Sequence, residues 1–523
     1  MAVCMFELLH LRNFEKVLSV NICNFPVPRV LIGCILAITF MLPDTVWAVE
    51  LSVSAHGRAR FRHTDLSNFR LDAKGTQHEQ EKWGHTLLRV YPEARVGESF
   101  LIRGDLQMLN GQLYGEESAH GQSVVLNPWK NQEASEQFEV REAYVQLPVG
   151  IGLLRVGRMV SHWGLGILAN GGDKENYLFA DASHGDISNR AIFFTKPAKA
   201  FNDGRLGEAL TLAIGADLVE RDELTDRSEG DEARQFVGAI LWKESDLEFG
   251  FYTANRNLEK SNGDLTKATA FDLFGRWEGD LSEDLSLKMS FEGAYIMGTT
   301  EQARFEGAQY PLDIRQFGGV LKTDTSHRGL DMGAGLELGL VSGDNSPQDG
   351  TARAMKLDPG YKVGMILFEE VLSRMSARSH DRVVDPDLVG TPPKGTHLIP
   401  TNGSITNTFY VHPHVKYSPW GDALEMQVGY LWAMAPADVV DPFSAAENGG
   451  YNQNAFGVNN ANGSLGSEFN ASLRSSFDMD GYFSIGVGLQ YGMFKPGAAL
   501  ASEEGVEGLG TIHKVRFLSD LSW

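Results

Sequence analysis

Residues 481–494 read GYFSIGVGLQYGMF, and this stretch decides the fold. Successive side chains of a β-strand point to opposite faces, so alternate residues share a face. One face is apolar and consists of Phe483, Ile485, Val487, Leu489, Tyr491 and Met493. The other face is small or polar and consists of Ser484, Gly486, Gly488, Gln490 and Gly492. A helix would not tolerate this much glycine. The stretch therefore predicts a strand, either half-buried in a soluble sheet or spanning a membrane with lipid outside and water inside.

The same alternation recurs along the 523 residues, which include 57 glycines. The predicted strands are 49–62, 83–96, 100–109, 138–147, 153–162, 190–201, 205–219, 234–243, 246–256, 269–279, 284–297, 312–323, 329–342, 405–417, 422–435, 466–477, 481–494 and 511–523. Tight turns and long polar connections alternate between them, as they do when both termini are periplasmic and the long loops are extracellular. We predict an all-β fold, a transmembrane antiparallel β-barrel of about 18 strands, with about 16 as the alternative count. A soluble solenoid or propeller would need a fixed repeat period, and no motif recurs.

The first 48 residues have the anatomy of a secretory signal peptide. Arg29 precedes an apolar run at 30–42, and Val46-Trp47-Ala48 supplies small residues for cleavage. We therefore expect a leader at 1–48 and a single barrel domain at 49–523. The cysteines all lie in this leader and are Cys4, Cys23 and Cys34. The mature chain is thus expected to contain no disulfide and no catalytic thiol.

The last predicted strand is apolar on one face and ends on an aromatic residue. Val515, Phe517, Leu521 and Trp523 share this face. A terminal aromatic on an alternating strand resembles the assembly signal of Gram-negative outer-membrane barrels, which Phe517 and Trp523 would carry. This resemblance predicts location in the outer membrane, with its lipid and the barrel-assembly machinery as partners. A soluble strand that happens to end in tryptophan is the alternative.

Basic side chains gather on the inward faces of strands that become neighbours when the barrel closes. Arginine is costly toward lipid, about 2–4 kcal/mol at the midplane, so these side chains should face water. The predicted basic wall consists of His56, Arg58, Arg60, Arg62, Arg89, Arg95, Arg103, Arg155, Lys514 and Arg516.

Other inward faces are acidic or polar. The predicted acidic and polar wall consists of Glu292, Glu337, Glu425, Glu468, Tyr410, His412, His414 and Lys416. A basic wall opposite an acidic one would create a transverse field that guides anions along the arginines. Alternatively, arginine and glutamate on neighbouring strands simply pair and brace a water-filled lumen. The sequence leaves both open.

The longest connection, 343–404, contains an apolar stretch at 363–375 that includes Glu369, Glu370 and Arg374. Loops of this length are usually functional or disordered. We predict a short helix folded into or over the pore mouth as a constriction or lid. A loop that caps the outer surface is the alternative.

Candidate catalytic neighbours are Ser161-His162, His184-Gly185-Asp186 and the pair His412 and His414. Fourteen histidines produce such neighbours by chance, and His412 with His414 would supply only two metal ligands. We therefore expect no enzymatic activity, no metal and no cofactor. A net charge of -22 and a pI of about 5.1 also argue against nucleic-acid binding.

Short motifs carry a resemblance to known barrels. REAYV at 141–145, LRVGR at 154–158 and WG at 163–164 resemble a hairpin common in porin-like outer-membrane proteins. SGDN at 342–345, DPF at 441–443 and YGMFKPG at 491–497 are similar to patterns in the alginate-export family and its uncharacterised relatives. The resemblance implies a barrel of about 18 strands that exports or admits an anionic solute.

Together these features predict a porin-like outer-membrane channel for small or anionic solutes, with a uronate polymer as one candidate. An adhesive or structural barrel, with a plugged or narrow lumen, is the first alternative. An outer-membrane hydrolase is the second.

Overall fold

The computed structural model describes residues 51–97, 99–115, 138–172, 179, 185–201, 204–303, 311–385, 387–388, 394–479 and 481–523. The predicted leader at 1–48, its three cysteines and His184 lie outside these residues.

The described chain forms a closed antiparallel barrel of 18 strands, as the alternation predicts. The barrel strands are β1 (Leu51–Leu66), β4 (Glu81–Val96), β5 (Phe100–Tyr114), β6 (Phe138–Val149), β7 (Gly152–Val160), β8 (Ile187–Thr195), β9 (Leu210–Arg221), β10 (Glu232–Lys243), β11 (Leu247–Glu259), β12 (Leu265–Asp280), β13 (Leu285–Thr300), β14 (Leu312–His327), β15 (Met332–Val341), β17 (Thr408–Tyr417), β19 (Glu425–Ala435), β20 (Gly463–Met479), β21 (Phe483–Pro496) and β22 (Ile512–Ser522). Each pairs with the next barrel strand along the chain.

The first and last strands close the barrel. β1 pairs with β22 in a register that runs from Arg58 opposite Ser522 to Leu66 opposite Lys514. Beyond β22, Trp523 exchanges two backbone hydrogen bonds of 3.0 Å with Gly57. Closure leaves no unpaired sheet edge, which removes the usual site of strand-to-strand aggregation.

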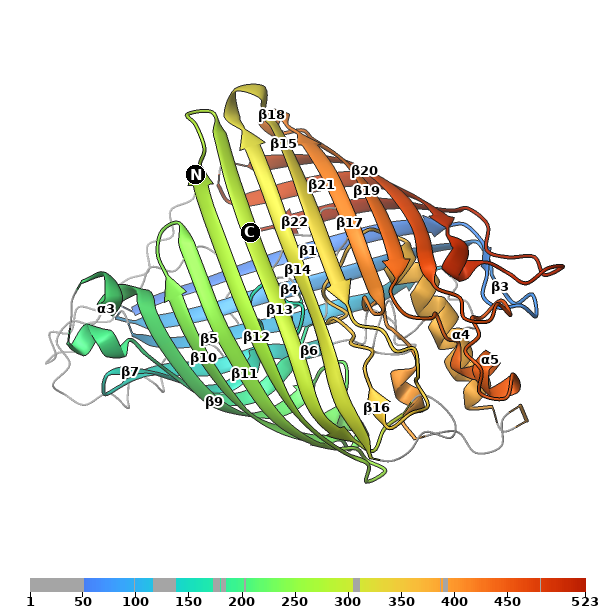
Figure 1. Ribbon diagram of the computed structural model, residues 1–523. Coiled ribbons are helices and arrows are strands. Elements are labelled where there is room, and N and C mark those ends of the chain that lie inside the picture. Colours follow the sequence, from blue (N-terminus) through green and yellow to red (C-terminus); the bar gives the residue numbers. More distant parts are fainter. Residues whose placement is uncertain are drawn as a thin grey trace, which may run out of the picture.

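Short turns lie at one end of the barrel and long connections at the other. In Figure 1 β18 (Pro419–Asp422) lies at the top of the view and α3 (Arg205–Ala209) at its left, both at the short-turn end. β3 (Gln77–His78), α4 (Ser373–Val383) and α5 (Pro442–Glu447) lie toward the lower right, at the long-loop end. The remaining short elements are β2 (Phe69–Arg70), β16 (Thr351–Ala352), the π-helix η5 (Leu367–Leu372), and the 3-10 turns η2 (Pro197–Ala200), η3 (Arg227–Glu229), η4 (Arg328–Leu330), η6 (Thr396–Leu398) and η7 (Ala498–Leu500).

The outer surface of the barrel is apolar. On β10 to β13, the outward side chains include Phe236, Phe251, Phe271 and Phe291, which are 36 to 68% exposed. Residues at the opposite parity, such as Asp272 and Glu292, are buried inside. The predicted alternation of apolar and polar faces therefore holds around the wall.

No helix in the described ranges is both long and apolar enough to cross a membrane.

The hairpin predicted at 190–201 and 205–219 is wrong at its turn. β8 ends at Thr195, and β9 begins only at Leu210. Between them lie η2 and α3. Pro197 has no backbone N–H to donate to a neighbouring strand, so the ladder stops before it.

A substitution at Gly298 on β13 would test how tightly neighbouring strands of the wall are packed. Its φ is 156°, and an added Cβ would lie 2.0 Å from the carbonyl oxygen of Lys267 on β12. We expect Gly298→Ala to lower the free energy of unfolding by about 1–3 kcal/mol. Gly293 on the same strand has its nearest atom at 3.9 Å, so Gly293→Ala is the matched control. Urea unfolding of the refolded variants in detergent would measure both, and equal stabilities would contradict the packing described.

Candidate functional site

The barrel interior is open at the short-turn end and filled by protein side chains at the long-loop end. A cavity of about 1010 Å³, here called the vestibule, lies at the short-turn end. Its Lys and Arg residues are Arg58, Arg60, Lys288, Arg328, Lys416 and Arg474. Its Asp and Glu residues are Asp324, Asp331, Glu425 and Asp520. The vestibule thus carries six basic and four acidic side chains, besides two histidines.

The described residues of 342–407, which are 342–385, 387–388 and 394–407, are here called the inserted segment, and its middle part occupies the interior at the long-loop end. Met365, Ile366, Leu367 and Phe368 are at most 2% exposed and belong to one large apolar core inside the barrel. The core also takes in wall residues such as Phe494. The connection between β15 and β17 is therefore packed as an interior element, because its apolar side chains are removed from water.

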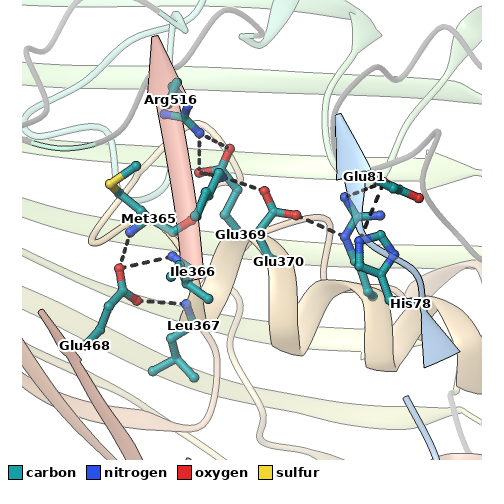
Figure 2. Close-up of polar contacts among 11 residues, drawn as sticks. His78, Glu81, Met365, Ile366, Leu367, Glu369, Glu370, Glu468 and Arg516 are labelled. Atoms are coloured by element: carbon teal, nitrogen blue, oxygen red, sulfur yellow. Dashed lines mark hydrogen bonds and ion pairs between the residues drawn. The ribbon is translucent and has the colours of Figure 1, made fainter. Parts of the chain in front are cut away.

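Glu468 on β20 fixes the start of the helical part of the inserted segment. Its carboxylate accepts backbone N–H groups from Met365 at 2.5 Å, Ile366 at 3.1 Å and Leu367 at 2.8 Å. Figure 2 shows these three bonds converging on the one side chain. A carboxylate at this position satisfies donors that the first helical turn leaves free and also opposes the helix dipole. Glu468 is fully buried and serves the inserted segment rather than an open lumen.

Charged side chains connect the inserted segment to the last strand. Lys514 on β22 donates to Glu370 Oε1 at 2.5 Å and to the carbonyl oxygen of Met365 at 3.0 Å. Arg374 Nε donates to the other oxygen of Glu370 at 3.0 Å. The side chains of Lys514, Glu370 and Arg374 are all fully buried. Removing one partner from such a group leaves a buried charge uncompensated, which costs about 3–5 kcal/mol.

The same network extends in both directions along the interior, as Figure 2 shows. Arg516 on β22 contacts Glu369 at 3.3 Å. On the other side, Arg374 lies 3.8 Å from Glu81, and Glu81 lies 3.5 Å from His78. β3, β4, α4 and β22 are thereby joined through one chain of charges. Lys514 and Arg516, predicted to line a basic pore wall, instead bind the acids of the inserted segment.

α4 carries a row of three arginines, of which only Arg374 was named as a candidate from the sequence. Arg374, Arg378 and Arg382 are spaced by four residues and so share a helix face. Arg378 donates to Asp72 at 3.1 Å, and Arg382 contacts Asp72 at 3.8 Å. Arg382 also lies 3.5 Å from the ring centroid of Phe443 in α5. The i, i+4, i+8 spacing was visible in the sequence, and it could have predicted a single charged face.

Most of the remaining predicted basic wall pairs with neighbours inside the barrel. Arg60 contacts Asp520 at 2.7 Å, and Arg89 donates to Gln107 at 2.8 Å. Arg95 pairs with Glu93, Arg103 pairs with Glu93 and Glu142, and Arg155 donates to Gln146. Arg58 lines the vestibule, and the positive charge of Arg62 interacts electrostatically with the Glu369 carboxylate. His56 is exposed near the start of β1. Cross-strand bracing, the alternative left open by the sequence, accounts for most of these contacts.

The predicted acidic and polar wall is split between the two halves. Glu337 is buried and accepts hydrogen bonds of 2.7 Å from Tyr361 of the inserted segment and from Tyr410. Glu292 is buried and accepts the backbone N–H of Leu165. In the vestibule, Lys416 pairs with Glu425, and His414 contacts Asp324 at 2.9 Å. His412 is only 2% exposed and lines a small cavity of about 120 Å³ that leads on from the vestibule.

The candidate catalytic pair at 161–162 has other bonding partners. Ser161 Oγ accepts from Arg190 at 2.9 Å, and His162 Nδ1 accepts from the backbone N–H of Gly171 at 3.2 Å. These contacts tie a loop to the wall. They explain the two side chains without a catalytic role.

The fold and its interior define a class: a closed antiparallel barrel with a charged vestibule and a long connection packed inside. No protein-family model and no curated protein matches the chain. The resemblance to the alginate-export family therefore stays a prediction.

Among solved structures, the chain is similar to the outer membrane protein OprD from Pseudomonas aeruginosa, with a TM-score of 0.48 and 11% identity over 90% of this chain and 93% of that chain. OccAB2 of Acinetobacter baumannii gives a TM-score of 0.48 at 9% identity, and OpdL of Pseudomonas aeruginosa 0.47 at 11%, each over 90% of this chain and 98% of that chain. Similarity at this level defines no family, and the fold rests on the strand pairing of the chain itself.

Lys514→Met tests the buried charge contact. We expect it to weaken the docking of the inserted segment by about 3 kcal/mol, which raises the undocked population about 100-fold. Limited trypsin digestion of the detergent-folded protein would report this as faster cleavage after Arg378 and Arg382, which are protected while α4 is packed. Lys416→Met removes a lysine from the vestibule and is the control. Equal cleavage rates in both variants would contradict the network described.

Docking should also respond to acid. Burial alone would raise the pKa of Glu369 and Glu370. The positive charges of Lys514 and Arg516 near Glu369, and of Lys514 and Arg374 near Glu370, outweigh this effect of burial. The pKa of both carboxyl groups therefore lies below the ordinary 4.5. A carboxyl whose pKa is lower in the folded state stabilises that state above its ordinary pKa, and this stabilisation is lost as the pH falls through the folded-state pKa. We expect docking to be constant between pH 7 and 5 and to weaken below about pH 4. Hydrogen exchange of the backbone amides at 365–375, corrected for its intrinsic pH dependence, should stay slow at pH 7 and 5 and become faster below about pH 4, and a loss of protection above pH 5 would contradict this assignment.

Proposed function

We propose that this barrel resides in a bacterial outer membrane. The apolar outer surface supports the proposal, because phenylalanines at 36 to 68% exposure on adjacent strands would be unfavourable in water and favourable in lipid. The charges lie inside or at the ends, as the bilayer requires. The cleaved leader at 1–48 and the assembly signal at Phe517 and Trp523 belong to the same proposal.

We further propose that the barrel is a porin-like channel for small solutes, with a preference for anions. The vestibule carries this proposal, because six basic and four acidic side chains give it a net positive charge within low-dielectric walls. A uronate polymer is a candidate solute because its carboxylates would suit guanidinium groups. Passage requires the inserted segment to move, since its apolar residues pack inside the barrel. No catalytic step is proposed.

An adhesive or structural barrel is the second candidate. The packing of the inserted segment favours it, because a lumen filled in this way is what such a barrel would have. Planar-bilayer recording of the refolded mature chain under a salt gradient separates the two. Openings with an anionic reversal potential support the channel, whereas silence from folded protein at neutral and acid pH supports the structural barrel.

Arg58 and Arg60 test the vestibule as the selectivity element. Replacing both with Glu changes the net charge of the vestibule from two positive to two negative. We expect the reversal potential to change sign. The control is Arg234→Glu with Lys267→Glu, which alters two exposed charges near the long-loop end. An unchanged selectivity in the Arg58 and Arg60 variant would overturn the anion preference while leaving the channel itself intact.

A further inference from the structure

Three carboxylates from separate segments meet near the long-loop end of the barrel. Asp186 immediately precedes β8, Glu223 follows β9, and Asp358 belongs to the inserted segment. One oxygen from each lies within 4.8 Å of the others. Two oxygens on opposite sides of one calcium ion would be about 4.6–5.2 Å apart, because Ca–O distances are about 2.3–2.6 Å. The cluster therefore has the dimensions of a calcium coordination sphere.

Asp358 supplies an independent observation. Its Oδ1 accepts the backbone N–H of Gly360 at 2.6 Å, and its own N–H donates to Ile167 at 2.9 Å. The residue is only 4% exposed, and its Oδ2 is buried with no hydrogen-bond partner among the described residues. A buried carboxylate oxygen without a partner is costly, so it calls for a ligand.

The other two residues lie on segments that hydrogen bonds hold in place. Asp186 Oδ2 accepts the backbone N–H of Asn170 at 3.3 Å, and the two residues also share a backbone hydrogen bond of 2.8 Å. Glu223 lies on a turn in which Asp222 accepts the N–H groups of Leu224 at 3.0 Å and Thr225 at 2.8 Å. A bound ion would therefore find the Asp186 carboxylate and the backbone of Glu223 already positioned.

Arg256 and Lys356 lie near the cluster, and both act on the charge of Glu223. Arg256 contacts Asp222 at 2.5 Å. Lys356 donates to the carbonyl oxygens of Leu398 at 2.6 Å and Pro400 at 2.7 Å. Burial and the adjacent carboxylates raise the pKa of Glu223 to about 7, and they raise the pKa of Asp186 and Asp358 as well. A bound divalent cation would add positive charge at the point where the three carboxylates meet.

We propose that Asp186, Glu223 and Asp358 form a binding site for one calcium ion. Carboxylate oxygens suit a hard divalent cation, and ligands from three separate segments suit the irregular geometry of calcium better than the strict octahedron of magnesium. The ion joins the inserted segment to the connections before β8 and after β9, and so clamps that segment at a point away from Lys514 and Glu468. The site does not depend on the proposed channel function, because binding is independent of conduction.

Equilibrium dialysis of EDTA-treated, refolded protein against radioactive calcium tests the site. We expect one calcium per chain at free calcium up to about 1 mM, the upper range of extracellular modules. Asp358→Asn and Glu223→Gln should each weaken binding at least about tenfold. Glu229→Gln removes an exposed charge from the same connection as Glu223 and should bind as the wild type does. Calcium should also raise the unfolding temperature of the wild type and of Glu229→Gln, but not that of Asp358→Asn or Glu223→Gln.

Circular dichroism of each variant shows that the barrel has formed, and either of the two cluster variants suffices if the other misfolds. No calcium bound to the wild type at about 1 mM would overturn the proposal. So would wild-type affinity in both cluster variants, since the ion would then sit elsewhere. A third outcome would also overturn the proposal: the wild type binds no calcium and Asp358→Asn makes the protein more stable. In that case bound protons and Arg256 neutralise the cluster.

Discussion

The ion pair between Lys514 and Glu370 is the interaction on which the interior depends. It joins the last barrel strand to the inserted segment at 2.5 Å with both side chains fully buried. Neither group can be left alone there, because an uncompensated buried charge costs several kcal/mol. Glu369, Arg374, Arg516 and Glu81 extend the same constraint, so the inserted segment has one favourable position against β22 and β4.

This constraint explains why the two halves of the interior differ. Docking of the inserted segment places its apolar residues against inward wall residues such as Phe494, so these side chains are removed from water. No such segment fills the short-turn half among the described residues, and a cavity of about 1010 Å³ lined by charged side chains lies there. In the proposed function, the long-loop half controls whether a solute passes. The short-turn half, which contains the vestibule, selects the solute by its charge.

Sequence alone predicts the wall well and the interior poorly. The alternation of faces is a local pattern, so residues 481–494 alone identify a strand that the structure places at Phe483–Pro496. The same alternation in the last strand shows that Lys514 and Arg516 point inward. Their partners lie 144 and 147 residues away, and no local pattern encodes which inward charge meets Glu369 or Glu370. The row of arginines on α4 could be predicted from its spacing, but its partner Asp72 could not. Pro197 was the one visible signal that the predicted turn near 202 would fail.

The most direct test is to fix the inserted segment to the wall reversibly. A Cβ added at Gly492 on β21 would lie 3.0 Å from Cδ1 of Ile366, and Gly492 is the register partner of Lys514. The expected mature chain contains no other cysteine, so Ile366→Cys with Gly492→Cys permits one cross-link. Our account predicts that the oxidised protein is silent in a planar bilayer and that reduction restores openings. Equal conductance in the oxidised and reduced states would contradict it.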